Sequence, residues 1–225
     1  MKKQHLNILM IDDHAMILKS YVDVLRVLES QTETYHFNIE QAHSIMEATA
    51  TLSEGFKKRQ LHMVLLDIGL PQYKNYLSGL DLGVAIRKDY PNCKIMVITG
   101  YNHYHLIQKL LDSVKPEALL IKSEINPDGF KLAFLDVLQQ VPHYSKTVRK
   151  YLTQIPSKPM VLDHYDVLLL FYLSEGKRTK ELPAVLPISM ASIERRKRKL
   201  KDILHLEADS SDVQLLNRAK EEGFL

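Results

Sequence analysis

The sequence has a single cysteine among its 225 residues and no long uninterrupted apolar run. One cysteine excludes an intramolecular disulfide and a metal site built from several thiolates, so we expect Cys93 to pack as a small apolar side chain. A membrane-spanning helix needs about 18 or more consecutive apolar residues, and none is present. The start of the chain carries charges within its apolar stretch, unlike a signal peptide. We therefore expect a cytoplasmic protein without a membrane partner.

Composition is that of a globular protein, with 45% hydrophobic and 25% charged residues. The formal net charge of +3 is unevenly divided along the chain. Residues 1–141 hold 15 Lys and Arg against 16 Asp and Glu, whereas residues 142–225 hold 15 against 11. A polyanionic partner would accordingly bind the C-terminal third.

Five short apolar runs alternate with segments of helical spacing in the first part of the chain. Four of the five runs are continuously apolar, which is typical of strands covered on both faces of a parallel sheet. The intervening segments repeat apolar residues at intervals of three and four, as amphipathic helices do. We predict an α/β fold with a doubly wound five-stranded parallel sheet, whose strands lie within 6–12, 35–42, 61–67, 93–100 and 118–123.

The alternation ends after residue 141. Residues 142–159 contain three prolines around one short helical stretch and are predicted to form a linker. Residues 160–225 show helical patterns only, which predicts a small all-α domain.

Polar residues follow the predicted strands at the edge where open α/β sheets bind their ligands. Asp12 and Asp13 end the first run, Asp67 the third, Thr99 the fourth and Lys122 the fifth. Two carboxylates about 4 Å apart repel by roughly 4 kcal/mol at an effective dielectric near 20, so clustered acids need a cation. Oxygen ligands favour a hard ion, and Mg²⁺ suits a few carboxylates with room for a phosphate oxygen. The ammonium of Lys122 and the hydroxyl of Thr99 would bind a tetrahedral anion.

The motifs MIDDH, LLDIGLP, VITG and LLIKS resemble those of the receiver domain of two-component response regulators, which has a flavodoxin-like fold. The resemblance covers roughly residues 5–141, and we assign residues 1–141 to this domain. It implies that Asp67 is the phosphoacceptor and takes its phosphoryl group from a sensor histidine kinase. It implies that Thr99 and Lys122 bind the phosphoryl oxygens. The implied Mg²⁺ ligands are Asp12, Asp13, Asp67 and the backbone carbonyl of Gly69.

Some residues depart from the receiver pattern. The loop after Pro71 is longer than the usual connection, Leu119 replaces an aromatic switch residue, and Ser123 replaces a proline. A degenerate receiver that is not phosphorylated, acting as a phosphorylation-independent DNA-binding protein or adaptor, is the alternative. A Mg²⁺-dependent phosphohydrolase is disfavoured, because Gly69 stands where a second acid is needed. We therefore expect that this protein is not an enzyme.

The densest basic run, RRKRKLK, lies in a segment with helical spacing. At about 100° per residue Ile193, Leu200 and Leu204 form one apolar stripe, and Ser189 is a suitable N-cap after the breaker Pro187. Basic side chains on the opposite side suit the major groove of DNA. A basic helix face is also commonly solvated surface or a docking site for an acidic protein.

A short segment, TKELPAVL, precedes this helix by a tight turn, which is a helix-turn-helix arrangement. Residues 160–225 resemble the LuxR-type DNA-binding domain through SEGKRTKEL, LPISMASIERRKRKLKDIL and AKEEGFL. The resemblance implies a recognition helix over about 190–204. The implied base-facing residues are Glu194, Arg195 and Arg198. The implied phosphate contacts are Lys177, Arg178, Thr179, Lys199 and Lys201.

Together the two resemblances imply a transcription factor that binds double-stranded DNA and forms a homodimer when phosphorylated. An adaptor whose basic helix binds a protein instead of DNA is the remaining alternative. Pro183 stands where the DNA-binding family usually has alanine in the scaffolding helix, and proline removes a backbone donor there.

Overall fold

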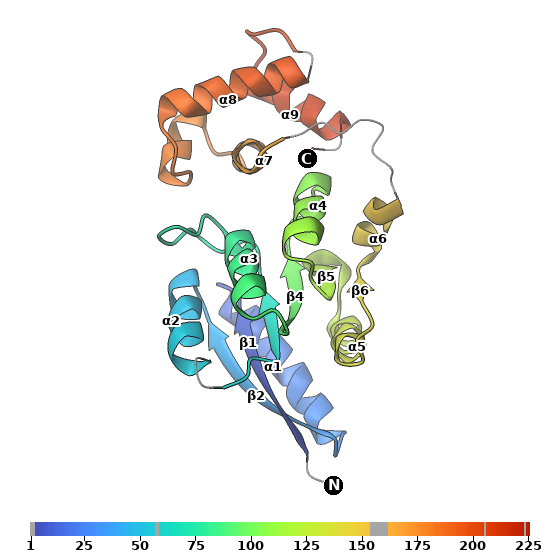
Figure 1. Cartoon of the computed structure of the whole chain (residues 1–225). Coiled ribbons are helices and arrows are strands. Elements are labelled where there is room, and N and C mark those ends of the chain that lie inside the picture. Colours follow the sequence, from blue (N-terminus) through green and yellow to red (C-terminus); the bar gives the residue numbers. More distant parts are fainter. Residues whose placement is uncertain (1–2, 57–58, 154–161, 205, 223) are drawn as a thin grey trace. The chain divides into compact units, whose positions relative to one another are not determined.

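The computed structural model describes residues 3–56, 59–153, 162–204, 206–222 and 224–225. The chain divides into two compact units (Figure 1). The first contains Met1–Asn102 and Lys109–Leu152, and the second contains His103–Gln108 and Thr153–Leu225. Part of the predicted linker, at 154–159, lies outside the described residues.

The first unit is built on one parallel sheet with the strand order β2-β1-β3-β4-β5-β6. The chain runs from β1 to its neighbour β2 and then crosses to β3 on the other side of β1, so the strand order reverses at β1. This crossing makes the sheet doubly wound, as the continuous apolar runs predict. The strands are β1 (Gln4–Ile11), β2 (Tyr35–Ala42), β3 (Met63–Leu66), β4 (Lys94–Thr99), β5 (Ala118–Ile121) and β6 (His143–Tyr144).

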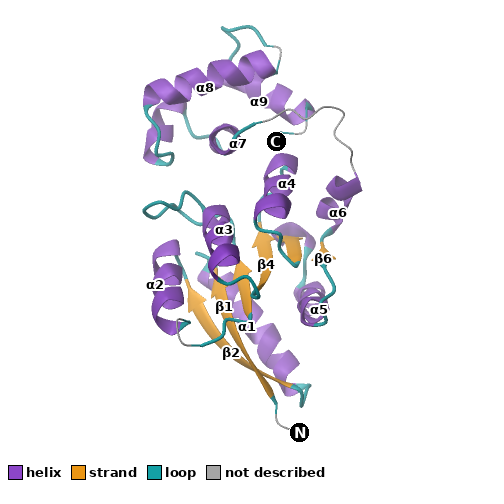
Figure 2. Cartoon of the chain, viewed as in Figure 1, coloured by secondary structure: helices purple, strands orange, loops and turns teal. Residues whose placement is uncertain are grey.

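Helices cover both faces of this sheet, which forms a single layer between them (Figure 2). Ile8 and Met10 of β1 belong to one core cluster with Leu25 of α1 and with Phe130 and Phe134 of α5, so α1 and α5 cover the same face. The described helices are α1 (Ala15–Ser30), α2 (Ile45–Gly55), α3 (Gly79–Asp89), α4 (Tyr104–Ser113), the 3-10 turn η1 (Lys122–Glu124) and α5 (Pro127–Leu138).

The sheet has a sixth strand, so the prediction of five strands is wrong by one. The N–H of His143 donates to the carbonyl of Glu117 at 3.0 Å, and that of Ser145 to the carbonyl of Leu119 at 3.1 Å. A pair of residues is too short to show an apolar period, so the sequence predicts a linker rather than a strand at these residues. Helix α6 (Lys146–Thr153) follows directly.

The described part of the second unit is helical, as predicted. Its apolar α7 packs against α8, α9 and the 3-10 turn η2. The segment predicted to be a scaffolding helix is this 3-10 turn, with Pro183 inside it, because proline cannot donate the backbone hydrogen bond that a continuing α-helix needs. The elements are α7 (His164–Ser174), η2 (Thr179–Ala184), α8 (Met190–Ile203) and α9 (Asp212–Glu221).

Within the described ranges, none of the helices combines the length and the apolar character that crossing a bilayer requires.

Candidate functional site

The carboxyl ends of β1 and β3 lie side by side at the point where the strand order reverses. Ile11 pairs with Leu66, and the N–H of Asp67 donates to the carbonyl of Ile11 at 2.9 Å. Asp12 and Asp67 therefore leave the sheet at the same edge. Asp12, Asp13 and Asp67, together with His14, offer ligand atoms that all lie within 4.8 Å of one another. The structure thus brings together the three acids that the sequence places at the ends of two separate strands.

Lys122 bridges the two buried acids of this cluster. Its Nζ lies 2.6 Å from Oδ2 of Asp12 and 2.7 Å from Oδ2 of Asp67. The Asp12 and Asp67 side chains are 4% and 5% exposed, so their charges are poorly screened by water and the ammonium partly neutralises both.

Burial and the ion pairs have opposite effects on the pKa values of Asp67 and Lys122. Burial raises the pKa of Asp67 above its ordinary value, and hydrogen bonds from Lys122 and the Gly69 N–H offset only part of that rise. For Lys122, burial by itself lowers the pKa, but the hydrogen bonds to Asp12 and Asp67 outweigh it and leave the pKa raised. The lysine is therefore held in its charged form beside a carboxylate whose negative charge is costly to bury.

The donor set fits a divalent cation. Asp12 and Asp67 are buried while the Asp13 side chain is 33% exposed, so the cluster is open to solvent on one side. Clustered carboxylate oxygens are the ligands that hard divalent ions prefer. The Gly69 N–H donates to Oδ1 of Asp67 at 3.0 Å, which places Gly69 beside the acid. Metal ligation by its carbonyl stays a prediction.

Thr99 and Tyr101 line the edge of the site on the β4 side. Thr99 is fully buried, and its hydroxyl accepts a hydrogen bond from the N–H of Tyr101 at 3.1 Å. A methyl group added at Gly69 would lie 3.0 Å from the Tyr101 hydroxyl and 3.4 Å from Oδ2 of Asp67. Tyr101 therefore places an aromatic side chain next to the acid. Its only sequence signal is its position two residues after Thr99.

The residues that depart from the receiver pattern lie in a loop, in β5 and in η1. Tyr73 and Tyr76 in the long loop exchange two backbone hydrogen bonds, at 2.9 and 3.0 Å, with Lys74 at a positive φ of 51° between them. The loop therefore forms a small hairpin. Leu119 is fully buried in β5, and Ser123 lies within η1.

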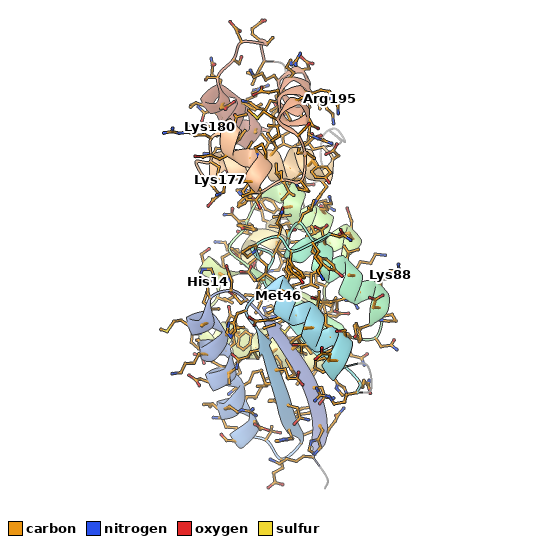
Figure 3. All side chains as sticks on the ribbon, turned by 90° about the vertical axis from the view of Figure 1, so that its left-hand side faces the viewer. His14, Met46, Lys88, Lys177, Lys180 and Arg195 are labelled. Atoms are coloured by element: carbon orange, nitrogen blue, oxygen red, sulfur yellow. The ribbon has the colours of Figure 1, made fainter. Side chains whose placement is uncertain are left out.

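In the second unit α8 has the predicted polarity. Ser189 caps it by accepting from the N–H of Ser192 at 3.2 Å, and Ile193, Leu200 and Leu204 are buried. Glu194 is partly exposed. Other side chains on or near α8 are exposed, among them Arg195, Arg198, Lys177, Arg178 and Lys180; Figure 3 labels Arg195, Lys177 and Lys180.

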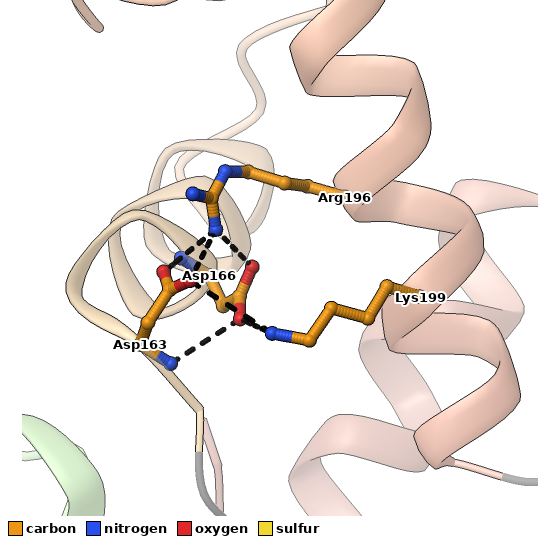
Figure 4. Close-up of polar contacts among 4 residues, drawn as sticks. All are labelled: Asp163, Asp166, Arg196 and Lys199. Atoms are coloured by element: carbon orange, nitrogen blue, oxygen red, sulfur yellow. Dashed lines mark hydrogen bonds and ion pairs between the residues drawn. The ribbon is translucent and has the colours of Figure 1, made fainter.

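Two basic residues of α8 are engaged by acids at the start of α7 (Figure 4). Nη1 of Arg196 lies 2.6 Å from Oδ2 of Asp163 and 2.7 Å from Oδ1 of Asp166. Nζ of Lys199 lies 2.6 Å from Oδ2 of Asp166, whose side chain is 0% exposed. We name Asp163, Asp166, Arg196 and Lys199 the α7–α8 ion cluster. Lys199, predicted to contact DNA phosphates, is therefore an internal ion-pair partner here.

Further residues predicted to contact DNA phosphates also have partners within the unit. The Thr179 hydroxyl donates to Asp212 at 3.0 Å and accepts from the buried Lys197 at 2.8 Å. Lys201 donates to the carbonyl of Ala208 at 2.8 Å. The basic run is thus divided between side chains that hold the unit together and side chains that are exposed.

The parallel sheet and the acids and lysine at its switch point together are those of a response regulator receiver domain. The chain belongs to the response regulator receiver domain family, whose family model matches residues 8–124, more than half of the chain. No curated protein matches this sequence.

Solved structures extend the likeness to the whole chain. A structure of the RcsB response regulator of Salmonella typhimurium, concerned with conformational dynamism for DNA interaction, is 23% identical with a TM-score of 0.72, over 98% of this chain and 99% of that chain. A complex of the two-component response regulator RcsB with DNA is 21% identical with a TM-score of 0.59, over 96% and 98% of the two chains. RcsB of Salmonella enterica serovar Typhimurium, bound to a promoter in the presence of the phosphomimetic BeF3−, is 21% identical with a TM-score of 0.58, also over 96% and 98%. These likenesses establish the fold of a receiver followed by a helix-turn-helix unit.

Proposed function

We propose that this protein is a DNA-binding transcriptional regulator that a sensor histidine kinase controls by phosphorylating Asp67. The observation that carries the proposal is the contact of Lys122 with both Asp12 and Asp67 at the switch point of the sheet. Membership of the receiver family supports the first half of the proposal, and the exposed basic side chains of a helix-turn-helix unit support the second.

Phosphorylation of Asp67 requires little covalent chemistry from the rest of the protein. A carboxylate oxygen of Asp67 attacks the phosphorus of a phosphohistidine, so that a P–O bond forms while the P–N bond breaks and the imidazole leaves. Such a transfer depends mainly on alignment and on neutralising charge. A divalent ion held by Asp12, Asp13 and Asp67, for which we propose Mg²⁺, would supply part of that neutralisation. Lys122 is placed to supply the rest, and we propose that Thr99 donates its hydroxyl hydrogen to a phosphoryl oxygen.

Incubation with acetyl phosphate and Mg²⁺ is expected to add one phosphoryl group, read by intact mass. Asp67→Asn removes the attacking oxygen and should abolish the addition. Asp89→Asn, at an exposed acid of α3, is the matched control and should be labelled like the wild type. Unlabelled wild-type protein, or equal labelling of Asp67→Asn, would favour the degenerate receiver. Sustained release of phosphate from a small phosphomonoester would instead favour the phosphohydrolase.

The second half of the proposal assigns DNA contacts to the exposed basic residues. We propose that Glu194, Arg195 and Arg198 face the bases, since a helix N-terminal half in the major groove can present arginine to guanine and glutamate to cytosine. Lys177 and Arg178 are proposed phosphate contacts. Hydrogen bonds within the unit already engage Lys199, Thr179 and Lys201. We therefore propose that these residues support DNA binding by stabilising the unit.

Arg198→Ala is expected to weaken binding to a selected duplex by about 1–3 kcal/mol and to relax its sequence preference, because a bidentate base contact is lost. Lys177→Ala should weaken binding to all sequences and flatten the salt dependence by about 0.9 in the log–log slope, the effect of one phosphate contact. Fluorescence anisotropy across a salt series measures both, with the exposed Lys88 of the first unit changed to alanine as control. Absence of duplex binding, or weak binding that neither the α8 variants nor the salt concentration changes, would favour the protein adaptor.

Phosphorylation would act on DNA binding through assembly. We propose that the added phosphoryl charge beside Lys122 stabilises a receiver conformation that dimerises. Such modifications shift the equilibrium between two conformations of a protein surface. Two α8 helices separated by about one turn of DNA could then read a two-fold site. Sedimentation velocity with and without acetyl phosphate measures this step.

A further inference from the structure

His14 lies directly against two of the clustered acids. Its Nδ1 is 2.8 Å from Oδ1 of Asp13 and 3.1 Å from Oδ1 of Asp12. Its backbone N–H also donates to Oδ1 of Asp12 at 2.9 Å, which fixes that oxygen relative to the imidazole. The His14 side chain is 63% exposed, and His14, labelled in Figure 3, directly precedes α1.

His14 holds the N-cap position of α1, yet its side chain makes no capping hydrogen bond. The N-cap side chains of α2, α3 and α5 all accept a hydrogen bond from their helices. At α1 the imidazole is turned toward the acids instead. Helix capping therefore does not explain the side-chain orientation of His14.

Asp12 divides the cluster into two halves. Its Oδ2 contacts Lys122, which also contacts Asp67, and its Oδ1 contacts His14, which also contacts Asp13. The lysine half is buried, whereas the His14 half is open to solvent. A cation arriving from solvent would meet the His14 half first.

The separations in the His14 half match those of neighbouring ligands around one ion. In an octahedral site with bonds of about 2.1 Å, adjacent ligand atoms lie about 3.0 Å apart. The same separations are also hydrogen-bond lengths. However, one imidazole N–H cannot point well at two carboxylate groups at once. A divalent ion between His14, Asp12 and Asp13 satisfies all three side chains. The ligand atom that Asp67 offers lies within 4.8 Å of theirs, so this ion is the same one that we propose for phosphorylation.

We propose that His14 supplies a nitrogen ligand to the divalent ion of the receiver, so that the site prefers a first-row transition ion such as Mn²⁺ to Mg²⁺. This inference rests on the proposed phosphoacceptor function of the same site. Imidazole is a good ligand for transition metals, whereas Mg²⁺ prefers oxygen and retains its waters. A nitrogen among the carboxylates therefore stabilises bound Mn²⁺ more than bound Mg²⁺.

Titration of the full-length protein with Mn²⁺, followed by the loss of the free-ion EPR signal, gives the Mn²⁺ affinity, and competition with Mg²⁺ gives the selectivity. His14→Ala is expected to lower Mn²⁺ affinity by about 10- to 100-fold, the scale on which supporting groups affect metal sites, and to lower Mg²⁺ affinity much less. The bound Mn²⁺ should show nitrogen coupling by pulsed EPR, and this coupling should disappear in His14→Ala.

Two further variants separate ligation from hydrogen bonding. His14→Gln keeps an N–H donor but removes the imidazole, so it should lose the nitrogen coupling and the Mn²⁺ preference. His143→Ala removes another histidine whose Nδ1 contacts an acid, Asp136, at 2.7 Å away from this cluster, and should change neither.

The outcome that overturns the inference is wild-type bound Mn²⁺ without nitrogen coupling, or equal losses of Mn²⁺ and Mg²⁺ affinity in His14→Ala with rescue by His14→Gln. That result would make His14 a hydrogen-bond donor only. If acetyl phosphate still labels Asp67 in the same preparation, the proposed function survives. If labelling fails with either ion although Mn²⁺ binds with nitrogen coupling, the proposed function fails and the inference stands.

Discussion

Replacing Lys122 with methionine is expected to destabilise the metal-free protein by about 3–5 kcal/mol at neutral pH, the usual cost of removing one partner from a buried ion pair. The Asp12 and Asp67 side chains are 4% and 5% exposed, and each has an oxygen within 2.7 Å of the ammonium. Without that ammonium the two carboxylates face each other with little water to screen them. Urea unfolding followed by circular dichroism measures the change.

Lys88→Met, at an exposed lysine labelled in Figure 3, is the control and should alter stability by no more than about 0.5 kcal/mol. Adding Asp67→Asn to Lys122→Met removes one of the facing charges and should restore part of the loss. A Lys122→Met protein as stable as the Lys88→Met control would contradict the ion-pair geometry.

The loss in Lys122→Met is also expected to depend on pH. The pKa of Asp67 is already raised in the folded wild type, chiefly by burial. A carboxyl whose folded pKa exceeds its unfolded value contributes stability below the unfolded pKa and loses it as pH rises through the folded pKa. Removing the lysine raises that folded pKa further, so the variant should lose stability more steeply between acidic and neutral pH. Its deficit relative to the wild type should therefore shrink as pH falls toward about 4, the region where aspartates titrate.

Asp166→Ala is expected to destabilise the second unit by about 2–3 kcal/mol and to weaken DNA binding. Its carboxylate is 0% exposed and pairs with Arg196 and Lys199 of α8 at 2.7 and 2.6 Å. The loss of stability should stay below about 3–5 kcal/mol, the usual effect of breaking a buried ion pair. The reason is that the Lys199 side chain is 46% exposed and therefore partly solvated. Since this cluster ties α8 to the start of α7, its loss frees the helix that we propose reads DNA.

Asp202→Ala, at an exposed acid on α8 itself, is the matched control for net charge and should be close to neutral in stability. DNA affinity is compared by anisotropy at a temperature where each variant is folded by circular dichroism. If Asp166→Ala unfolds like Asp202→Ala and binds DNA like the wild type, the α7–α8 ion cluster has no supporting role.

The core of the first unit could be predicted because burial on both faces demands continuous apolarity. The run MVLL became β3, all of whose residues are buried, and its flanking Asp67 came to the edge where the sequence placed it. The strand β6 could not be predicted in this way. It exists because the carbonyls of Glu117 and Leu119 on the edge of β5 accept from N–H groups of the residues that follow α5.

The basic run RRKRKLK shows what helical spacing alone cannot predict. Helical spacing correctly separates the buried Leu200 from the exposed Arg198. It does not indicate that Lys199, also on the outer side, meets Asp166, which lies 33 residues earlier in the chain. Spacing describes one helix at a time, whereas ion pairs depend on which helices pack together.

The sequence by itself determined the layered α/β unit, its acidic edge and the helical unit with a basic helix, because periodicity and strand-end residues are local properties of the chain. Only the tertiary structure decided which polar groups meet. It placed Lys122 between two buried carboxylates, turned His14 toward Asp12 and Asp13, and engaged Arg196 and Lys199 with acids of another helix. The pairings of Lys122, Arg196 and Lys199 join residues from different elements, and their energies arise when folding removes water from charges that the unfolded chain keeps solvated and apart.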